Sequence, residues 1–188
     1  MLTKKILAAN ELLRREAKRA PPLAVAQDGV FEGYASLFGI VDLGGDEVMP
    51  GAFRTSLSRR DANSVRMLWQ HDPSMPIGSW ISIEEDRRGL KVKGRLNLAV
   101  GRAREALALL RDGAVDGLSI GFRVKNARKS RQDGVRRLFE LDLWEVSIVT
   151  FPMLPQARVS AVKRHRAPAL AAVAHTADLY RRAAALLT

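Results

Sequence analysis

Residues 117–122 read Gly-Leu-Ser-Ile-Gly-Phe, which places one hydroxyl group between two glycines inside an apolar run. Because glycine lacks a Cβ atom, it lets a substrate or another backbone approach closely. Ser119 is therefore either a nucleophile presented on a strand or a serine buried between two packing glycines. A serine becomes a nucleophile only when a base and an orienting group lie beside it.

The spelling G-x-S-x-G also matches the nucleophile elbow of α/β-hydrolases, and the flanking sequence decides against that fold. The elbow requires a helix directly after the serine and a histidine after the acid. Here the apolar run continues as a strand through Arg123 and Val124, and the only later histidines, His165 and His175, lie near the carboxyl terminus. The chain also lacks a repeated strand–helix–strand pattern.

Strand patterns surround this stretch and set the fold class. The clearest covers residues 90–98, where apolar residues and Gly94 alternate with Lys91, Lys93, Arg95 and Asn97, as expected of a half-buried antiparallel strand. Further strands are predicted at residues 29–38, 64–71, 76–83, 116–124 and 135–150. The sequence predicts an α+β fold with six or seven strands. Antiparallel pairing is favoured because most connections are too short for crossovers.

Two short helices are predicted among these strands. One covers residues 51–59, directly after Pro50. The other covers residues 101–113 and ends at Gly113; its apolar face is Ala103, Ala106, Leu107 and Leu110.

The 188 residues and their charge predict one folded domain, residues 21–156, with a basic tail at each end. Residues 1–20 form a predicted amphipathic arm with six Lys/Arg and two Glu. Residues 157–188 form a basic linker and an Ala/Leu-rich helix with six Lys/Arg and one Asp. The net charge of +11 is thus concentrated in the tails, which favours docking to an acidic partner. A nucleic-acid-binding function is disfavoured, because it would place a basic face on the folded body.

The composition excludes several chemistries. The chain has no cysteine, so it contains neither a disulfide, nor a thiolate metal site, nor a cysteine nucleophile. No stretch has the roughly 20 apolar residues that span a bilayer, and the amino terminus lacks the apolar block of a signal peptide. We expect a soluble intracellular protein.

His71 is the best candidate for the base that Ser119 needs. It ends an apolar strand and precedes Asp72-Pro73, a corner that can hold a functional group on a rigid scaffold. His165 lies in a basic linker and His175 in a tail helix, where neither is expected to be functional.

The strand at residues 138–150 offers three carboxylates that could orient His71. Glu145 lies between large apolar neighbours, where a carboxylate is costly unless it is paired. Asp142 is embedded in the same strand, and Glu140 lies near its solvated end. All three remain candidates at this point, and an ion pair with an arginine is the structural alternative for each.

Five motifs together resemble the HK97-type prohead protease family of tailed phages. In order they are residues 31–35 (FEGYA), the 42–53 segment with Gly45-Asp46 and PGAF, residues 68–78 with LWQHD and PIG, residues 117–122 and residues 145–149 (EVSIV). Each motif alone is weak, but the resemblance covers about residues 29–157 in the family's order.

The resemblance implies a serine peptidase related in fold to the herpesvirus assemblins, a β-barrel with surrounding helices. It implies Ser119 as nucleophile, His71 as base and, by motif, Glu145 as the third member, without metal or cofactor. Its implied role is to cleave the scaffold or the scaffolding portion of the major capsid protein, and then itself, inside the immature head in the bacterial cytoplasm.

Similar enzymes occur in phage-derived elements such as gene transfer agents. A homo-oligomer is left open, and a membrane partner is not expected. The competing interpretation is a catalytically idle capsid-assembly factor that keeps the barrel.

Overall fold

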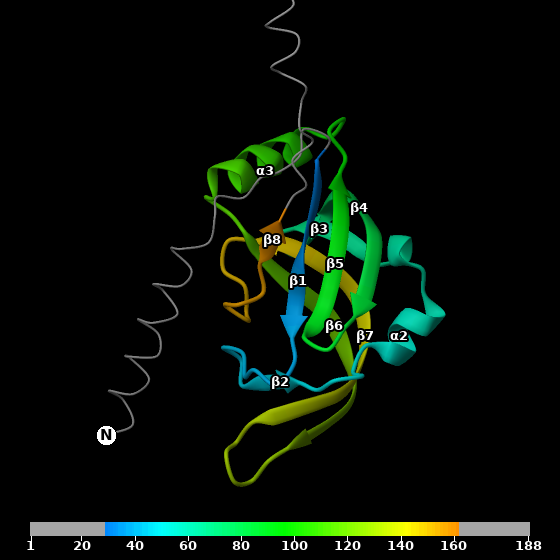
Figure 1. Cartoon of the computed structure of the whole chain (residues 1–188), viewed down its shortest axis with the longest axis vertical. Helices are drawn as coiled ribbons and strands as arrows, with labels where there is room; N and C mark the ends of the chain where they lie inside the picture. Colours follow the sequence, from blue (N-terminus) through cyan, green and yellow to red (C-terminus); the bar gives the residue numbers. More distant parts are fainter. Residues whose placement is uncertain (1–28, 162–188) are drawn as a thin grey trace, which may run out of the picture.

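The computed structural model describes residues 29–161, which form a single strongly curled sheet with few helices (Figure 1). The strands are β1 (Val30–Leu37), β2 (Asp46–Val48), β3 (Arg66–Trp69), β4 (Asp72–Glu85), β5 (Gly89–Leu96), β6 (Gly117–Lys129), β7 (Arg136–Val149) and β8 (Val159–Ala161). The helices are α2 (Arg54–Arg59), the 3₁₀ helix η1 (Ala62–Ser64) and α3 (Gly101–Asp112). The predicted arm at residues 1–20 and the tail helix lie outside the described residues.

The predicted α+β class with a mainly antiparallel sheet is confirmed, with two differences in pairing. The strand order is β2-β7-β3-β4-β5-β1-β8, and β6 pairs with the other edge of β7. Both β2 and β3 run parallel to β7, whereas the remaining pairs are antiparallel. Parallel pairing is possible here because long stretches of chain separate β7 from β2 and β3, so no tight turn has to join them.

Residues 157–159 close the curled sheet by bonding to both of its ends. The backbone N–H of Tyr34 in β1 donates to the carbonyl of Arg158 (3.1 Å), while the N–H of Leu118 in β6 donates to the carbonyl of Ala157 (2.9 Å). Gly33 permits this contact, since a Cβ atom there would lie 2.3 Å from the Arg158 carbonyl oxygen. The folded body therefore extends into the segment that the sequence predicts to be a linker.

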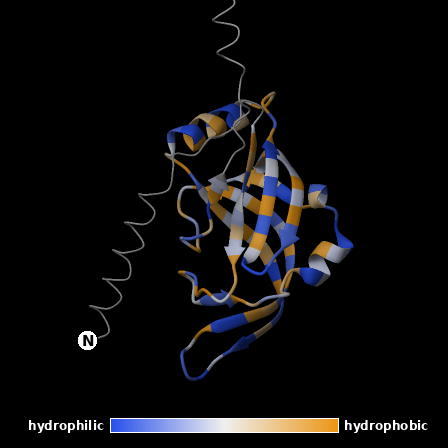
Figure 2. Cartoon of the chain, in the orientation of Figure 1, coloured by the Kyte–Doolittle hydropathy of each residue, from blue (hydrophilic) through white to orange (hydrophobic). Residues whose placement is uncertain are grey.

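The core follows the alternation read from the sequence. Leu90, Val92 and Leu96 of β5 are buried, and the stripes of apolar and polar residues on the central strands are visible in Figure 2. Helix α3 lies across one end of the sheet and buries the four residues predicted for its face, Ala103, Ala106, Leu107 and Leu110. Its end is also confirmed, because Gly113 adopts the left-handed conformation with φ of 69°.

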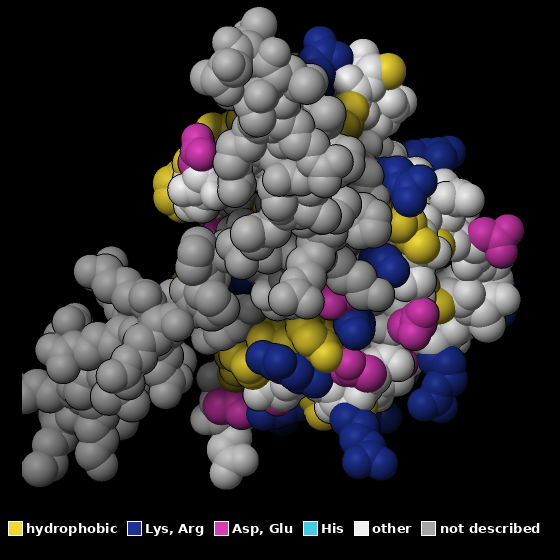
Figure 3. Space-filling model, turned by 45° about the horizontal axis from the view of Figure 1, so that its top comes forward, with side chains coloured by type: hydrophobic (Ala, Val, Ile, Leu, Met, Phe, Trp, Pro, Cys, Tyr) yellow, Lys and Arg dark blue, Asp and Glu magenta, His cyan; other side chains and the backbone are white. Residues whose placement is uncertain are grey.

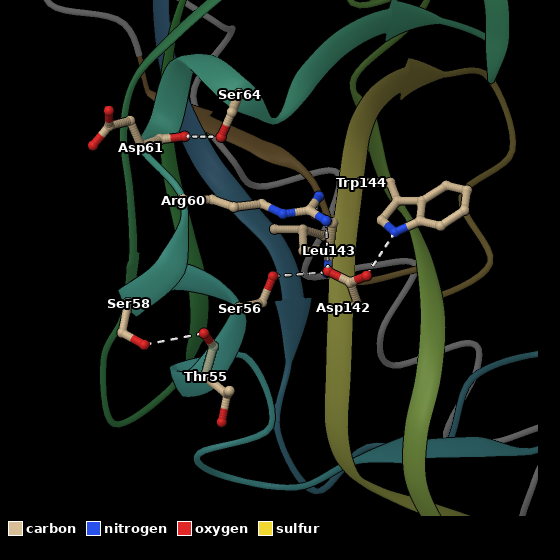
Figure 4. A network of polar contacts seen from close by, with 9 residues as sticks. All are labelled: Thr55, Ser56, Ser58, Arg60, Asp61, Ser64, Asp142, Leu143 and Trp144. Atoms are coloured by element: carbon tan, nitrogen blue, oxygen red, sulfur yellow. Dashed lines mark hydrogen bonds and ion pairs between the residues drawn. The ribbon is translucent and has the colours of Figure 1, made fainter.

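Helix α2 and the turn after it cover the part of the β7 edge that lies between β2 and β3. The Leu143 N–H donates to Ser56 Oγ (3.0 Å), and Arg60 Nη1 donates to the Leu143 carbonyl (3.1 Å), as Figure 4 shows. Arg60 also pairs with Asp142 at 3.0 Å. The side chains of Ser56 and Arg60 thus make the hydrogen bonds to the Leu143 N–H and carbonyl that a neighbouring strand would otherwise make.

A bulge at Trp144 changes which residues of β7 face the core. Gly121 of β6 is opposite Glu145, yet the next residue, Phe122, is opposite Leu143, so Trp144 is the extra residue. Before the bulge Leu141 and Leu143 enter the main core cluster, and after it Val146 and Ile148 do. A strict two-residue period would place Glu145 on the same face as Leu141 and Leu143. That expectation is wrong, because the bulge turns Glu145 away from the core.

On the face of the described body that is visible in Figure 3, positive and negative side chains are interspersed. Within residues 29–161 no helix is long and apolar enough to cross a membrane.

Candidate active site

The residues singled out by the sequence meet on three adjacent strands. β7 lies between β3 and β6, so that Ser147 of β7 is opposite Leu68 on one side and Ser119 on the other. Glu145 precedes Ser147 by two residues and therefore shares its face. His71 follows β3 directly. The topology thus brings Ser119, Glu145 and His71 to one end of the β6–β7–β3 ribbon.

His71 is held in a tight turn rather than at the end of a strand. The sequence predicts a strand over residues 64–71, but β3 ends at Trp69, and Trp69 pairs with Asp72 across a two-residue loop. Gln70 and His71 have φ values of 54° and 61°, the left-handed region that a primed hairpin turn requires at both positions. Non-glycine residues occupy this region at a cost, typically at functional sites.

Hydrogen bonds to β7 and the residue after it hold this turn. The Gln70 N–H donates to the Ile148 carbonyl (3.0 Å), and the Gln70 side-chain amide donates to Thr150 Oγ1 (2.7 Å). The His71 N–H donates to Ser147 Oγ (3.2 Å). The position of the imidazole is therefore fixed relative to Glu145.

His71 and Glu145 form a direct pair. His71 Nδ1 lies 2.5 Å from Glu145 Oε1. The Glu145 side chain is only 13% exposed, whereas the His71 side chain is 43% exposed. The hydrogen bond to Glu145, together with the negative charge of that carboxylate, raises the pKa of His71 above its ordinary value of 6.5, and partial burial opposes the rise. This pairing leaves Nε2 of the imidazole available to another partner.

Ser119 and His71 both line a cavity of about 360 Å³. Ser119 is only 7% exposed, so it is a buried part of this lining rather than a residue on an open surface. Most of the other lining residues are apolar, among them Leu37, Ile40 and Phe151. Asp42 and Asp46 are the acidic residues of the lining. The cavity has the mixture of apolar walls and few polar groups that is typical of a ligand site.

A side chain at either of the two glycines that flank Ser119 would clash, and the clashing group differs between them. A Cβ atom on Gly121 would lie 2.2 Å from Glu145 Oε1, so Gly121 leaves room for the carboxylate that contacts His71. A Cβ atom on Gly117 would lie 2.6 Å from the Val149 carbonyl oxygen and 2.8 Å from Pro152 Cδ. Each glycine is therefore required by a close approach from β7 or from the loop after it.

The other two candidate carboxylates have different surroundings. Asp142 accepts a hydrogen bond from Trp144 Nε1 (2.9 Å) and pairs with Arg60, and the Trp144 bond lowers the pKa of Asp142. Glu140 is half-buried and is opposite Asn126 in the β6–β7 pair. Among the described residues, Glu145 is the carboxylate in contact with His71.

Comparison with known proteins identifies the family. The model of the caudovirus prohead serine protease family matches residues 16–171. The chain belongs to this family.

Two curated relatives of this chain are phage prohead proteases. That of Enterobacteria phage HK97 is 38% identical over 141 residues, which are 73% of this chain and 61% of the relative. That of Escherichia phage T5 is 30% identical over 113 residues, which are 59% of this chain and 52% of the relative. The chain thus spans between half and two thirds of the length of these relatives.

A solved structure supports the fold of this family member. The capsid assembly protease of bacteriophage T4 superimposes with a TM-score of 0.53 and 13% identity, over 64% of this chain and 80% of the T4 chain. At this identity the likeness concerns the fold alone.

Sequence reasoning missed Ser147, which the structure places at this candidate site. Ser147 is fully buried, accepts the His71 N–H and donates to Glu145 Oε2 at 2.6 Å. Its position two residues after Glu145, on the same face of β7, is the signal that could have indicated it.

Proposed function

We propose that the chain is a serine endopeptidase in which Ser119 is the nucleophile, His71 the general base and Glu145 the residue that orients His71. The contact between His71 Nδ1 and Glu145 Oε1, at the cavity that Ser119 lines, is the observation that carries this proposal. A buried carboxylate holding one imidazole nitrogen leaves the other nitrogen to take a proton from the serine.

In this mechanism the Nδ1–H of His71 donates to Glu145 while Nε2 accepts the Ser119 proton. Ser119 Oγ forms a bond to the substrate carbonyl carbon, and the resulting imidazolium is stabilised by Glu145. His71 then returns the proton to the leaving amine as the C–N bond breaks, which leaves an acyl-enzyme. Water, activated by the same imidazole, hydrolyses the ester and regenerates Ser119.

The proposed substrates are the capsid protein and its scaffolding segment, within the immature head. Family membership and the two phage prohead proteases support this assignment. A further relative, a capsid polyprotein of Pseudomonas phage PAJU2, is 30% identical over 105 residues, which are 53% of this chain and 16% of the relative. Association with capsid proteins is therefore the partner class we propose, in the bacterial cytoplasm, with self-cleavage as a second activity.

The covalent reaction of Ser119 with a fluorophosphonate probe tests the peptidase assignment directly. We expect a mass increase of one probe per chain, and a rate that rises with pH through a midpoint above 6.5. Only the neutral imidazole accepts the Ser119 proton, and the pKa of His71 is raised by Glu145, so reactivity is lost as the pH falls below that raised value. Intact-mass spectrometry across pH 5–9 measures both quantities.

A chain that stays unlabelled at every pH, even in assembled particles, would instead support the catalytically idle assembly factor. A midpoint below 6.5 would contradict the pairing of His71 with Glu145.

The Gly121→Ala substitution should slow the same labelling reaction by about 10²-fold, because displacing a catalytic group by about 1 Å costs this much. The new Cβ atom would displace the Glu145 carboxylate from His71. Gly101→Ala is the matched control, since its Cβ atom would meet only the flexible end of Arg104, at 3.8 Å. Equal labelling rates in the two variants would show that Gly121 does not protect the His71–Glu145 pair.

A further inference from the structure

Ser147 joins the backbone of His71 to the side chain of Glu145. Its Oγ accepts the His71 N–H at 3.2 Å and donates to Glu145 Oε2 at 2.6 Å. Glu145 Oε1 in turn pairs with His71 Nδ1. The three residues therefore form a closed ring of hydrogen bonds, in which both carboxylate oxygens of Glu145 are engaged.

The ring determines the direction of the Ser147 hydroxyl proton. A serine hydroxyl has one proton to donate, and the His71 N–H is itself a donor, so Ser147 must accept from His71 and donate to Glu145. Ser147 is 0% exposed, and water therefore does not compete for these bonds. Glu145 has no rotational freedom while both of its oxygens keep these partners.

The hydrogen bond from the His71 N–H to Ser147 stabilises an unfavourable backbone conformation at His71. It occupies the left-handed region with φ of 61°, in a turn without glycine. Such a conformation persists only when surrounding contacts hold it. The Ser147 hydroxyl is the acceptor for the His71 N–H, so the same atom that fixes Glu145 also fixes the backbone that carries the imidazole.

We propose that Ser147 is a positioning residue of the active site, which sets the imidazole of His71 and the carboxylate of Glu145 in the geometry that activates Ser119. The proposal rests on the proposed peptidase function for its catalytic consequence. It does not make Ser147 a reacting group, because its side chain is fully buried and its one proton is donated to Glu145.

The test compares three variants of the full chain by nuclear magnetic resonance and by fluorophosphonate labelling. Ser147→Ala removes the bridging oxygen, and Ser147→Thr retains a hydroxyl. Ser56→Ala is the matched control. Like Ser147, Ser56 is a buried serine whose Oγ accepts one backbone N–H, in this case that of Leu143 in β7. This hydrogen bond involves neither His71 nor Glu145. The imidazole signal of His71 is identified among the three histidines of the chain by its loss in His71→Gln.

In Ser147→Ala we expect the pKa of His71 to fall toward its ordinary value, because the freed carboxylate of Glu145 turns away from Nδ1. Asp42 and Asp46, which line the same cavity, are unchanged in every variant. Labelling should slow by about 10- to 100-fold, in line with the cost of a misplaced catalytic group. Ser147→Thr should keep the pKa of His71 and the labelling rate close to those of the unaltered chain. Ser56→Ala should change neither quantity.

Two results would overturn the proposal. In the first, Ser147→Ala lowers the melting temperature as Ser56→Ala does but leaves the His71 pKa and the labelling rate unchanged. In the second, the pKa of His71 rises in Ser147→Ala. This would show that the Ser147 hydroxyl reduces the effect of the Glu145 charge on His71 and does not position the carboxylate. The pKa measurement needs no catalytic activity, so failure of the peptidase assignment is seen separately, as absent labelling in the unaltered chain.

Discussion

The Ser119→Ala variant should lose cleavage of the capsid-protein precursor by about 10⁴-fold or more, as serine peptidases do when the nucleophile is removed. No covalent intermediate can form without Oγ, although substrate binding and the His71–Glu145 pair remain. The change deletes one oxygen from a residue that is 7% exposed, and the fold should therefore be retained. Cleavage is followed by mass spectrometry of the precursor, and folding by circular dichroism during thermal melting.

Ser36→Ala is the informative comparison for this variant, because Ser36 is the other serine that lines the cavity and is buried to a similar degree. We expect Ser36→Ala to be labelled by fluorophosphonate at Ser119, whereas Ser119→Ala takes up no probe. Cleavage that survives in Ser119→Ala but disappears in Ser36→Ala would show that the nucleophile is Ser36 of β1 rather than Ser119.

The elements that the sequence predicts well are those in which local pattern and tertiary structure agree. The buried face of α3, its end at Gly113 and the alternation of β5 all depend on periodicity over one element. Helix and strand periods are properties of the backbone, and burial then selects the apolar side. These features needed no knowledge of which strands become neighbours.

The features that the sequence could not predict depend on contacts between distant segments. The turn at Gln70 and His71 contains neither glycine nor asparagine, so its left-handed backbone has no local signal; contacts with Ser147, Ile148 and Thr150 hold it. The bulge at Trp144 likewise breaks a pattern that reads as a continuous strand. Both departures from local rules lie at the candidate site, where such conflicts are expected.

The choice among three acidic residues was open in the sequence for the same reason. Without the bulge, Glu145 shares a face with the core residues before it, and Asp142 is equally embedded. The structure separates them, since Glu145 contacts His71 while Asp142 contacts Arg60 and Trp144.

The Glu145→Gln variant is therefore expected to lose about 10²- to 10⁴-fold in kcat/KM while keeping its fold, a loss comparable to that from replacing the acid of a serine protease triad with its amide. Glutamine has one carbonyl oxygen to share between two donors, His71 Nδ1–H and the Ser147 hydroxyl. When that oxygen faces Ser147, the amide N–H faces Nδ1, which must then be the unprotonated nitrogen. The proton moves to Nε2, and His71 can no longer accept the Ser119 proton.

Asp142→Asn provides the matched control, because it makes the same chemical change two strand residues before the bulged Trp144 and away from His71. It removes the charge that pairs with Arg60, a half-buried surface contact for which a loss of about 1 kcal/mol in stability is typical. We expect its pH profile to keep the midpoint of the unaltered chain, while the midpoint of Glu145→Gln moves down toward 6.5 as the carboxylate that raises the pKa of His71 is lost. If Asp142→Asn abolishes cleavage and Glu145→Gln does not, the orienting acid is Asp142. The 2.5 Å contact between Glu145 and His71 would then have no catalytic role.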